Sequence, residues 1–112
     1  MQQGLNRVTL IGRLNADPET RRAPSGVVAA TFGLAVPRTW TGPDGQPLSA
    51  TDAFNVVAWG ELADRCGQLL HSGSQAYVEG RLQVRAWTDS EGRQHQQTEI
   101  VATQVLPLCS EA

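Results

Sequence analysis

Residues 77–87 read YVEGRLQVRAW, and polar and apolar side chains alternate along them with a period of two, as in a β-strand. The apolar side of this strand carries Val78, Leu82, Val84 and Ala86. The opposite side carries Tyr77, Arg81, Arg85 and Trp87. A core strand normally turns its largest aromatic ring toward its other apolar residues, whereas Trp87 shares a side with two guanidinium groups. We therefore expect Trp87 to be exposed and to stack on nucleic-acid bases whose phosphates are held by arginine.

The other two tryptophans are also candidates for base stacking. Residues 51–59 alternate so that Phe54 lies on the core side and Trp59 on the outer side. Residues 37–50 are rich in proline and glycine, which predicts a long mobile hairpin loop with Trp40 near its base.

The remaining pattern predicts a small all-β domain with one short helix. Residues 5–14 form a strand with Arg7 and Arg13 on its outer side, and residues 27–36 and 97–106 form two more strands. A loop over residues 21–26 contains Arg21 and Arg22. A helix over residues 61–71 turns a set of apolar side chains inward at helical spacing, namely Leu62, Cys66, Leu69 and Leu70.

The order strand, strand, strand, helix, strand, strand is that of the OB-fold, a five-stranded Greek-key β-barrel with its helix between the third and fourth strands. OB-folds present one strand face and their loops to oligonucleotides or oligosaccharides. Another small β-barrel is the alternative, because the alternation pattern does not reveal which strands pair.

Charge is distributed unevenly along the 112 residues, whose length fits one domain. Residues 1–40 contain five arginines and two acidic residues, whereas residues 41–112 contain four arginines and nine acidic residues, for a net charge of −2. All nine basic residues are arginines, so every cation is a planar guanidinium that can pair with phosphate and stack on bases.

Several classes of protein do not fit the composition. No apolar run approaches the roughly 18 residues of a membrane span, and the N-terminus lacks the features of a secretory signal. The two cysteines, Cys66 and Cys109, predict free thiols in a reducing compartment. No nucleophile lies at a sensible spacing from a histidine, and two cysteines and two scattered histidines are too few for a metal site. We therefore predict a cytoplasmic protein with no catalytic residues, cofactor, metal or membrane partner.

Five motifs together resemble the bacterial single-stranded DNA-binding protein family. They are residues 6–14 (NRVTLIGRL), 32–36 (FGLAV), 56–63 (VVAWGELA), 77–80 (YVEG) and 85–89 (RAWTD). The matches run in order from about residue 4 to residue 108. Each motif alone is weakly specific, whereas the ordered set is highly specific.

The resemblance implies an OB-fold domain over residues 1–108, followed by a short C-terminal end at residues 109–112. It implies a nucleoid-associated homo-oligomer, usually a homotetramer, that binds single-stranded DNA without sequence preference in replication, recombination and repair. By position, Trp40, Trp59 and Trp87 match residues on which the family stacks bases. The basic positions that follow the DNA backbone are matched by Arg7, Arg13, Arg21 and Arg85. Arg22, in the same predicted loop as Arg21, is a further candidate for DNA contact.

The chain departs from the family in three features. Ala53 stands where a further aromatic residue is common, and the usual C-terminal extension with an acidic tip is absent, as in a short form. Many relatives also have Lys or Arg at positions where this chain does not, near Glu61, His71, Ser72, Gln83 and Ala86. Two alternatives therefore stay open. One is a primosomal replication-restart-type paralogue, which also lacks the acidic tail and works with a helicase or restart protein. The other is a protein-interaction OB module that has lost DNA binding, which the net charge of −2 and the missing basic positions favour.

Overall fold

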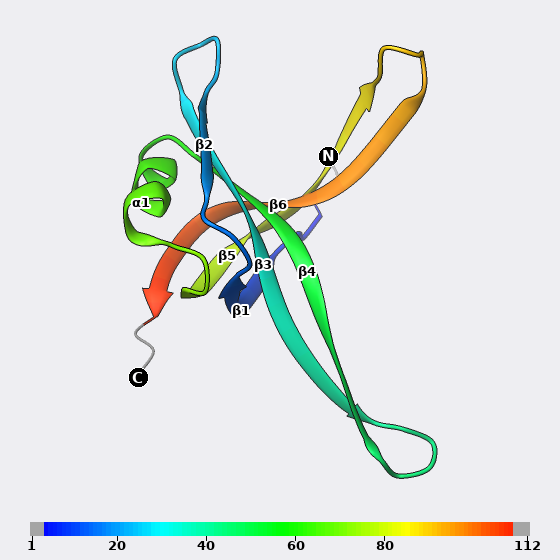
Figure 1. Ribbon diagram of the computed structural model, residues 1–112. Helices are drawn as coiled ribbons and strands as arrows, with labels where there is room; N and C mark the ends of the chain where they lie inside the picture. The colour runs from blue at the N-terminus through cyan, green and yellow to red at the C-terminus, as the bar shows by residue number, and fades with distance from the viewer. Residues whose placement is uncertain (1–3, 109–112) are drawn as a thin grey trace.

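Five long strands close into a barrel in the computed structural model, which describes residues 4–108 (Figure 1). They are β1 (Val8–Leu14), β3 (Val28–Thr41), β4 (Pro47–Trp59), β5 (Gln75–Thr88) and β6 (Gln94–Leu108). A short strand, β2 (Glu19–Arg22), joins the edge of β3, and the helix α1 (Glu61–Leu69) lies between β4 and β5. The strand order is β1-β5-β6-β4-β3-β2, and a second pairing of β1 with β3 closes the barrel. The predicted five-stranded barrel with one short helix is confirmed.

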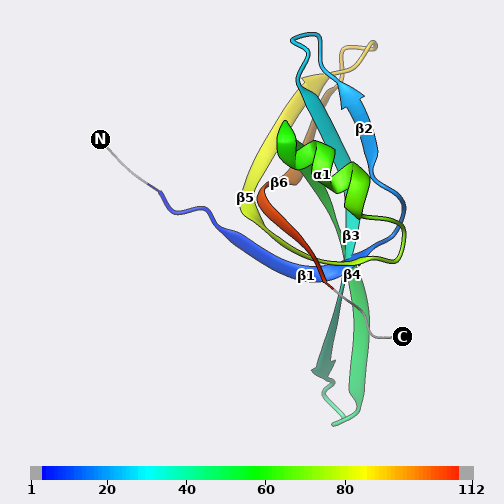
Figure 2. The same cartoon turned by 90° about the vertical axis from the view of Figure 1, so that its left-hand side faces the viewer.

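The barrel interior is filled by the inward-facing residues of every long strand. Leu34, Val56, Val78 and Ile100 are almost completely buried, one from each of β3, β4, β5 and β6. Alternation of side chains along the strands produces this interior, as expected from the sequence. The helix covers one end of the barrel (Figure 2) and contributes Ala63 and Cys66 to the same core.

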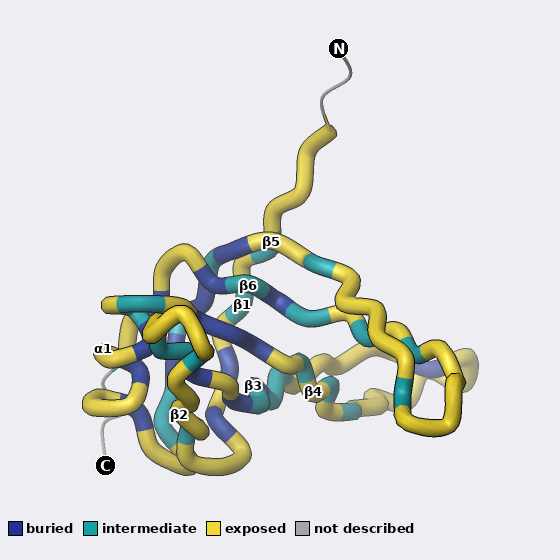
Figure 3. Tube along the Cα trace, turned by 90° about the horizontal axis from the view of Figure 1, so that it is seen from above, coloured by how far each residue is buried: buried dark blue, intermediate teal, exposed yellow. Residues whose placement is uncertain are grey.

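Three hairpins extend beyond the core, and their residues are mostly exposed (Figure 3). They are formed by β2 with β3, by β3 with β4, and by β5 with β6. Each hairpin carries at least one arginine or tryptophan that the sequence marks as a candidate for DNA contact. The long strands therefore serve both to enclose the core and to present functional side chains.

The predicted loop around Arg21 and Arg22 is wrong, because both residues belong to β2. Arg21 pairs with Ala29 and Arg22 pairs with Val28 in an antiparallel ladder. All four residues of β2 are exposed. A strand without a buried side gives no alternation in the sequence, so the pattern on which strand prediction relies was missing.

The predicted long loop over residues 37–50 is also wrong. β3 and β4 continue as a paired ribbon as far as Thr41 and Pro47, and only residues 42–46 form the turn. Pro37 lies beyond Ala35, where β3 no longer pairs with β1, so the missing N–H of proline falls on an open edge of the ribbon. Trp40 therefore lies near the tip of a β-hairpin, opposite Leu48, rather than at the base of a loop.

Two further expectations about buried residues are corrected. Leu69 is exposed, because the helix ends there and the extended backbone of Leu70 turns the Leu70 side chain into the core instead. Leu82 and Val84 are also exposed, and so is Ala86. The β5–β6 hairpin leaves the barrel beyond Gly80, so the apolar side of β5 has no core to face.

The departure of this hairpin from the barrel coincides with an irregularity in strand pairing. The register between β5 and β6 shifts between Glu79 and Gly80, leaving Thr103 without a partner in the ladder. A side chain at Gly80 would collide with the carbonyl oxygen of Val101. Glycine is therefore required at this point of the β5–β6 pairing.

Candidate nucleic-acid interface

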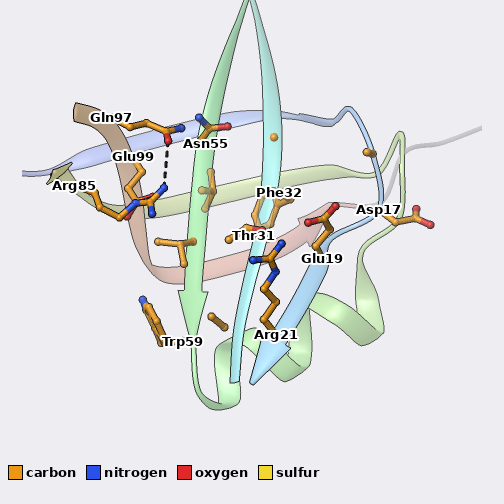
Figure 4. A pocket seen from close by; sticks show the side chains of 15 residues that line it. Asp17, Glu19, Arg21, Thr31, Phe32, Asn55, Trp59, Arg85, Gln97 and Glu99 are labelled. Atoms are coloured by element: carbon orange, nitrogen blue, oxygen red, sulfur yellow. Dashed lines mark hydrogen bonds and ion pairs between the residues drawn. The ribbon is translucent and has the colours of Figure 1, made fainter. Parts of the chain in front are cut away.

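An open groove of about 580 Å³ lies on the outer side of the sheet and is lined from β2, β3, β4, β5 and β6 (Figure 4). Strand register explains why Trp59 and Arg21 share it. Trp59 pairs with Ala29 across β4 and β3, and Ala29 pairs with Arg21 across β3 and β2. Directly paired residues project from the same side of a sheet, and the methyl group of Ala29 leaves space between the two larger side chains.

The second wall of the groove comes from the β5–β6 hairpin and holds Arg85 in place. Arg85 Nη2 donates a hydrogen bond to Oε1 of Gln97, its cross-strand partner, at 3.3 Å. Arg85 Nε lies 3.7 Å from Oε2 of Glu99. The guanidinium carbon also lies 4.7 Å from the centre of the Trp87 ring, two residues along the strand. The side chain of Arg85 thus links the groove to the Trp87 ring.

All three tryptophans are partly exposed, but they are in different places. Trp59 is 49% exposed in the groove, and Trp87 is 40% exposed on the β5–β6 hairpin. Trp40 is 42% exposed near the tip of the β3–β4 hairpin, which projects from another part of the barrel (Figure 1). Arg38 lies over the Trp40 ring at 4.7 Å and forms an ion pair with Asp52 at 2.8 Å.

The other candidate arginines lie outside the groove. Arg13 donates from Nη1 to the carbonyl oxygen of Gly73 at 3.0 Å. Arg22 donates from Nη1 to the carbonyl oxygen of Gly26 at 2.9 Å, within its own hairpin. Arg7 is exposed just before β1. The structure therefore brings together Arg21, Trp59 and Arg85, with Trp87 beside them, and separates the remaining four candidates from this group.

The groove also contains acidic and amide side chains that the sequence reasoning missed. Asp17, Glu19 and Glu99 line it alongside the two arginines, and Asn55 and Gln97 contribute amide groups. Gln97 faces Arg85 through the pairing of β5 with β6, a register that the alternation along one strand does not fix. The acids that come from β2 and from the segment before it were missed because β2 itself was not predicted.

The described chain offers no obvious place for a metal ion. Within residues 4–108, no group of three or more His, Cys, Asp and Glu side chains is arranged to hold one. The Cys66 thiol lies on the buried side of α1, and burial raises its pKa, so the thiol stays protonated and packs as an apolar group. Cys109 lies outside the described residues. No helix in this part of the chain is long and apolar enough to cross a membrane.

Comparison with known proteins agrees with this geometry. The model of the single-strand binding protein family matches residues 5–108. The chain belongs to this family. It is 44% identical over 109 residues to Single-stranded DNA-binding protein 1 of Chlorobaculum tepidum, covering 96% of this chain and 67% of that protein. It is also 44% identical over 101 residues to Single-stranded DNA-binding protein 2 of Listeria monocytogenes, covering 90% of this chain and 62% of that protein.

Solved structures of single-strand binding proteins have the same fold. The Plasmodium falciparum SSB in complex with ssDNA superimposes with a TM-score of 0.89 at 28% identity, over 97% of this chain and 99% of that one. A deletion mutant of the single-stranded DNA binding protein from Thermus aquaticus gives 0.86 at 33% identity, over 96% of this chain and 52% of that one. The predicted OB-fold and the predicted family are confirmed, and the family is one of DNA-binding proteins without enzymatic activity.

Proposed function

We propose that this single-strand binding family protein holds single-stranded DNA without sequence preference, by stacking bases on tryptophan and pairing phosphates with arginine. One observation carries the proposal: Trp59, Arg21 and Arg85 line a single open groove (Figure 4). A base stacked on an indole of this kind contributes about 1–3 kcal/mol and is accepted whatever its identity, because every base has a π-face.

The two arginines of the groove supply the contacts to phosphate. Arg21 comes from β2 and Arg85 from β5, so a strand whose base lies on Trp59 has two guanidinium groups in the same groove. Pairing with phosphate releases condensed counterions, which makes the affinity fall as salt rises. Duplex DNA binds weakly in this scheme, because its bases are already paired and stacked and cannot reach the indole.

The candidates outside the groove extend the proposed path of the strand. Trp87 lies next to Arg85 and offers a second stacking surface on the β5–β6 hairpin, and Trp40 offers a third on the β3–β4 hairpin. Arg13 and Arg22 each use one N–H on a backbone carbonyl, so most of their five donors stay available to phosphate. We assign these residues and Arg7 to the parts of the strand that enter and leave the groove.

We also propose that the chain acts as a homo-oligomer, with a homotetramer as the expected form. Ile11, Tyr77 and Leu106 are direct cross-strand neighbours on the outer side of β1, β5 and β6, and Ile11 is half exposed there. Several DNA sites in one assembly would raise the effective concentration of each site for a long strand. Light scattering of the wild type and of Ile11→Glu tests this, since loss of that apolar surface is expected to lower the assembled mass.

The proposed roles in replication, recombination and repair, and the cytoplasmic, nucleoid-associated location, are carried over from the family. So is the division into one DNA-binding domain over residues 1–108 and a short end at residues 109–112. A replication-restart paralogue would share the groove and differ in its dependence on a helicase or restart partner. An interaction module that has lost DNA binding would keep the barrel but give no DNA affinity.

Tryptophan fluorescence during titration with oligo(dT) tests the proposal. We expect strong quenching by the single strand, weaker binding at high salt, and little change with duplex DNA of the same length. Absence of quenching and of binding in a folded protein would refute the proposal and favour the interaction module.

A further inference from the structure

The turn of the β5–β6 hairpin is organised by one carboxylate. Asp89 Oδ1 accepts hydrogen bonds from the backbone N–H groups of Glu91 and Arg93, both at 2.9 Å. The other oxygen of the same carboxylate, Oδ2, lies 2.7 Å from Nε2 of His95. Asp89 therefore connects the backbone of the turn to one side chain of β6.

That side chain is in contact with the proposed stacking surface. His95 is the cross-strand partner of Trp87, and their rings are stacked with centres 5.4 Å apart and planes 19° apart. Arg85 lies over the same indole at 4.7 Å. Trp87 thus contacts one neighbour from each strand, and its orientation depends on His95, which Asp89 orients in turn.

We propose that Asp89 and His95 are positioning residues for Trp87, and that protonation of His95 strengthens the binding of single-stranded DNA. The inference rests on the proposed function of the groove and adds a proton-dependent control to it. His95 is one of two histidines in the chain, and histidine is the side chain that ordinarily changes its charge between about pH 5 and pH 8.

The charges around His95 give the direction of the effect. Asp89 contacts the ring directly from the turn, and Arg85 of β5 lies over the neighbouring Trp87 ring. Glu91 and Arg93 form an exposed pair of opposite charge at 3.8 Å on the same turn, and the β6 neighbours Gln94 and Gln96 are uncharged. The hydrogen bond from His95 holds the pKa of Asp89 below its ordinary value, helped by the backbone N–H groups of the turn, so the carboxylate stays ionised.

Protonation of His95 therefore changes the Asp89–His95 pair from a net charge of −1 to a net charge of zero. A DNA phosphate near Trp87 then meets one less uncompensated negative charge. A unit charge at contact distance in water changes an equilibrium by about fivefold, and this is the gain in affinity that we expect on acidification. The protonated ring also keeps its stacked position, since it now forms a charged pair with Asp89.

Binding of dye-labelled oligo(dT), measured by fluorescence anisotropy between about pH 5.5 and pH 8 at constant ionic strength, tests the inference. Thymine has no group that titrates in this range, so a change in affinity belongs to the protein. We expect the wild type to bind about fivefold more tightly at the acidic end. His95→Gln should remove this pH dependence, whereas the matched control His71→Gln, just beyond the C-terminal end of α1, should retain it. Asp89→Ala should reduce this pH dependence, because the partner that orients the His95 ring against Trp87 is lost.

A second readout follows the Trp87 ring in the absence of DNA. In a protein with Trp40→Phe and Trp59→Phe, the remaining indole should lose emission as His95 becomes protonated, and His95→Gln should abolish that change. Equal pH dependence in the wild type and in His95→Gln would overturn the inference. Binding of oligo(dT) with a flat pH profile would overturn the inference alone, whereas failure of the wild type to bind at any pH would overturn the proposed function as well.

Discussion

Glu99 is expected to weaken DNA binding by occupying Arg85, and Glu99→Gln should therefore raise the affinity. The Glu99 carboxylate lies 3.7 Å from Arg85 Nε, and its side chain is only 14% exposed, so it cannot easily turn away into solvent. A phosphate that approaches Arg85 must compete with this carboxylate and is also repelled by it. Glutamine keeps the shape of the side chain and removes the charge.

The magnitude follows from the distance and the exposure. Two unit charges separated by about 4 Å interact with about 1 kcal/mol in water, and with more in a partly buried setting. Since the Arg85 side chain is 53% exposed, we use the value for water, which corresponds to about a fivefold gain in affinity. One additional phosphate contact should also steepen the dependence of log affinity on log salt by about 0.7 for a single strand.

The assay is titration of labelled oligo(dT) at several salt concentrations, with Glu91→Gln as the matched control. Glu91 lies on the same hairpin and pairs with Arg93 at 3.8 Å, but it is outside the groove and highly exposed. Both variants change the net charge equally. An unchanged or lower affinity of a folded Glu99→Gln protein, or an equal gain in Glu91→Gln, would refute the view that Glu99 restrains Arg85.

Three other variants test the fold and the groove. Gly80→Ala should lower the free energy of unfolding by about 1–3 kcal/mol in urea denaturation, because the new methyl group collides with the Val101 carbonyl oxygen. The pKa of Tyr77, the single tyrosine, lies above its ordinary value because its hydroxyl donates to Glu79 at 2.7 Å, so Glu79→Gln should lower the pKa seen in an alkaline absorbance titration. Trp59→Ala should weaken oligo(dT) binding by about tenfold to a hundredfold, the value of one lost stacking surface.

Each of these variants has a control. Gly4→Ala should leave stability unchanged, because nothing lies within 4 Å of the added methyl group, and equal stability of the two glycine variants would contradict the steric explanation. Glu91→Gln should leave the Tyr77 titration where it is, and an equal shift there would point to a general charge effect. Leu69→Ala removes an apolar side chain as exposed as Trp59 but outside the groove. A loss of DNA affinity in that variant would mean that exposed apolar residues matter in general.

The neighbours of Arg85 show how one residue could be placed correctly without its environment being known. Alternation along residues 77–87 puts Arg85 and Trp87 on the outer side of a strand, and the structure agrees. Glu99 and Asn55 come to the groove from other strands, through pairings that no local pattern specifies. The acidic side chains of the groove, and the expected effect of Glu99 on Arg85, therefore cannot be predicted from the sequence and follow only from the tertiary structure.

The sequence by itself determined the strand alternation, the place of the helix between the third and fourth long strands, and the outward direction of Trp59 and Trp87. These features follow from local periodicity, since side chains alternate across a strand whatever it pairs with. The tertiary structure decided which strands pair, where the hairpins leave the barrel, and therefore that Leu82 and Val84 are exposed. It also decided that Arg21, Trp59 and Arg85 share one groove while Trp40 lies elsewhere. These outcomes depend on register between distant segments, and a register is selected by the packing of the whole barrel rather than by the residues of one strand.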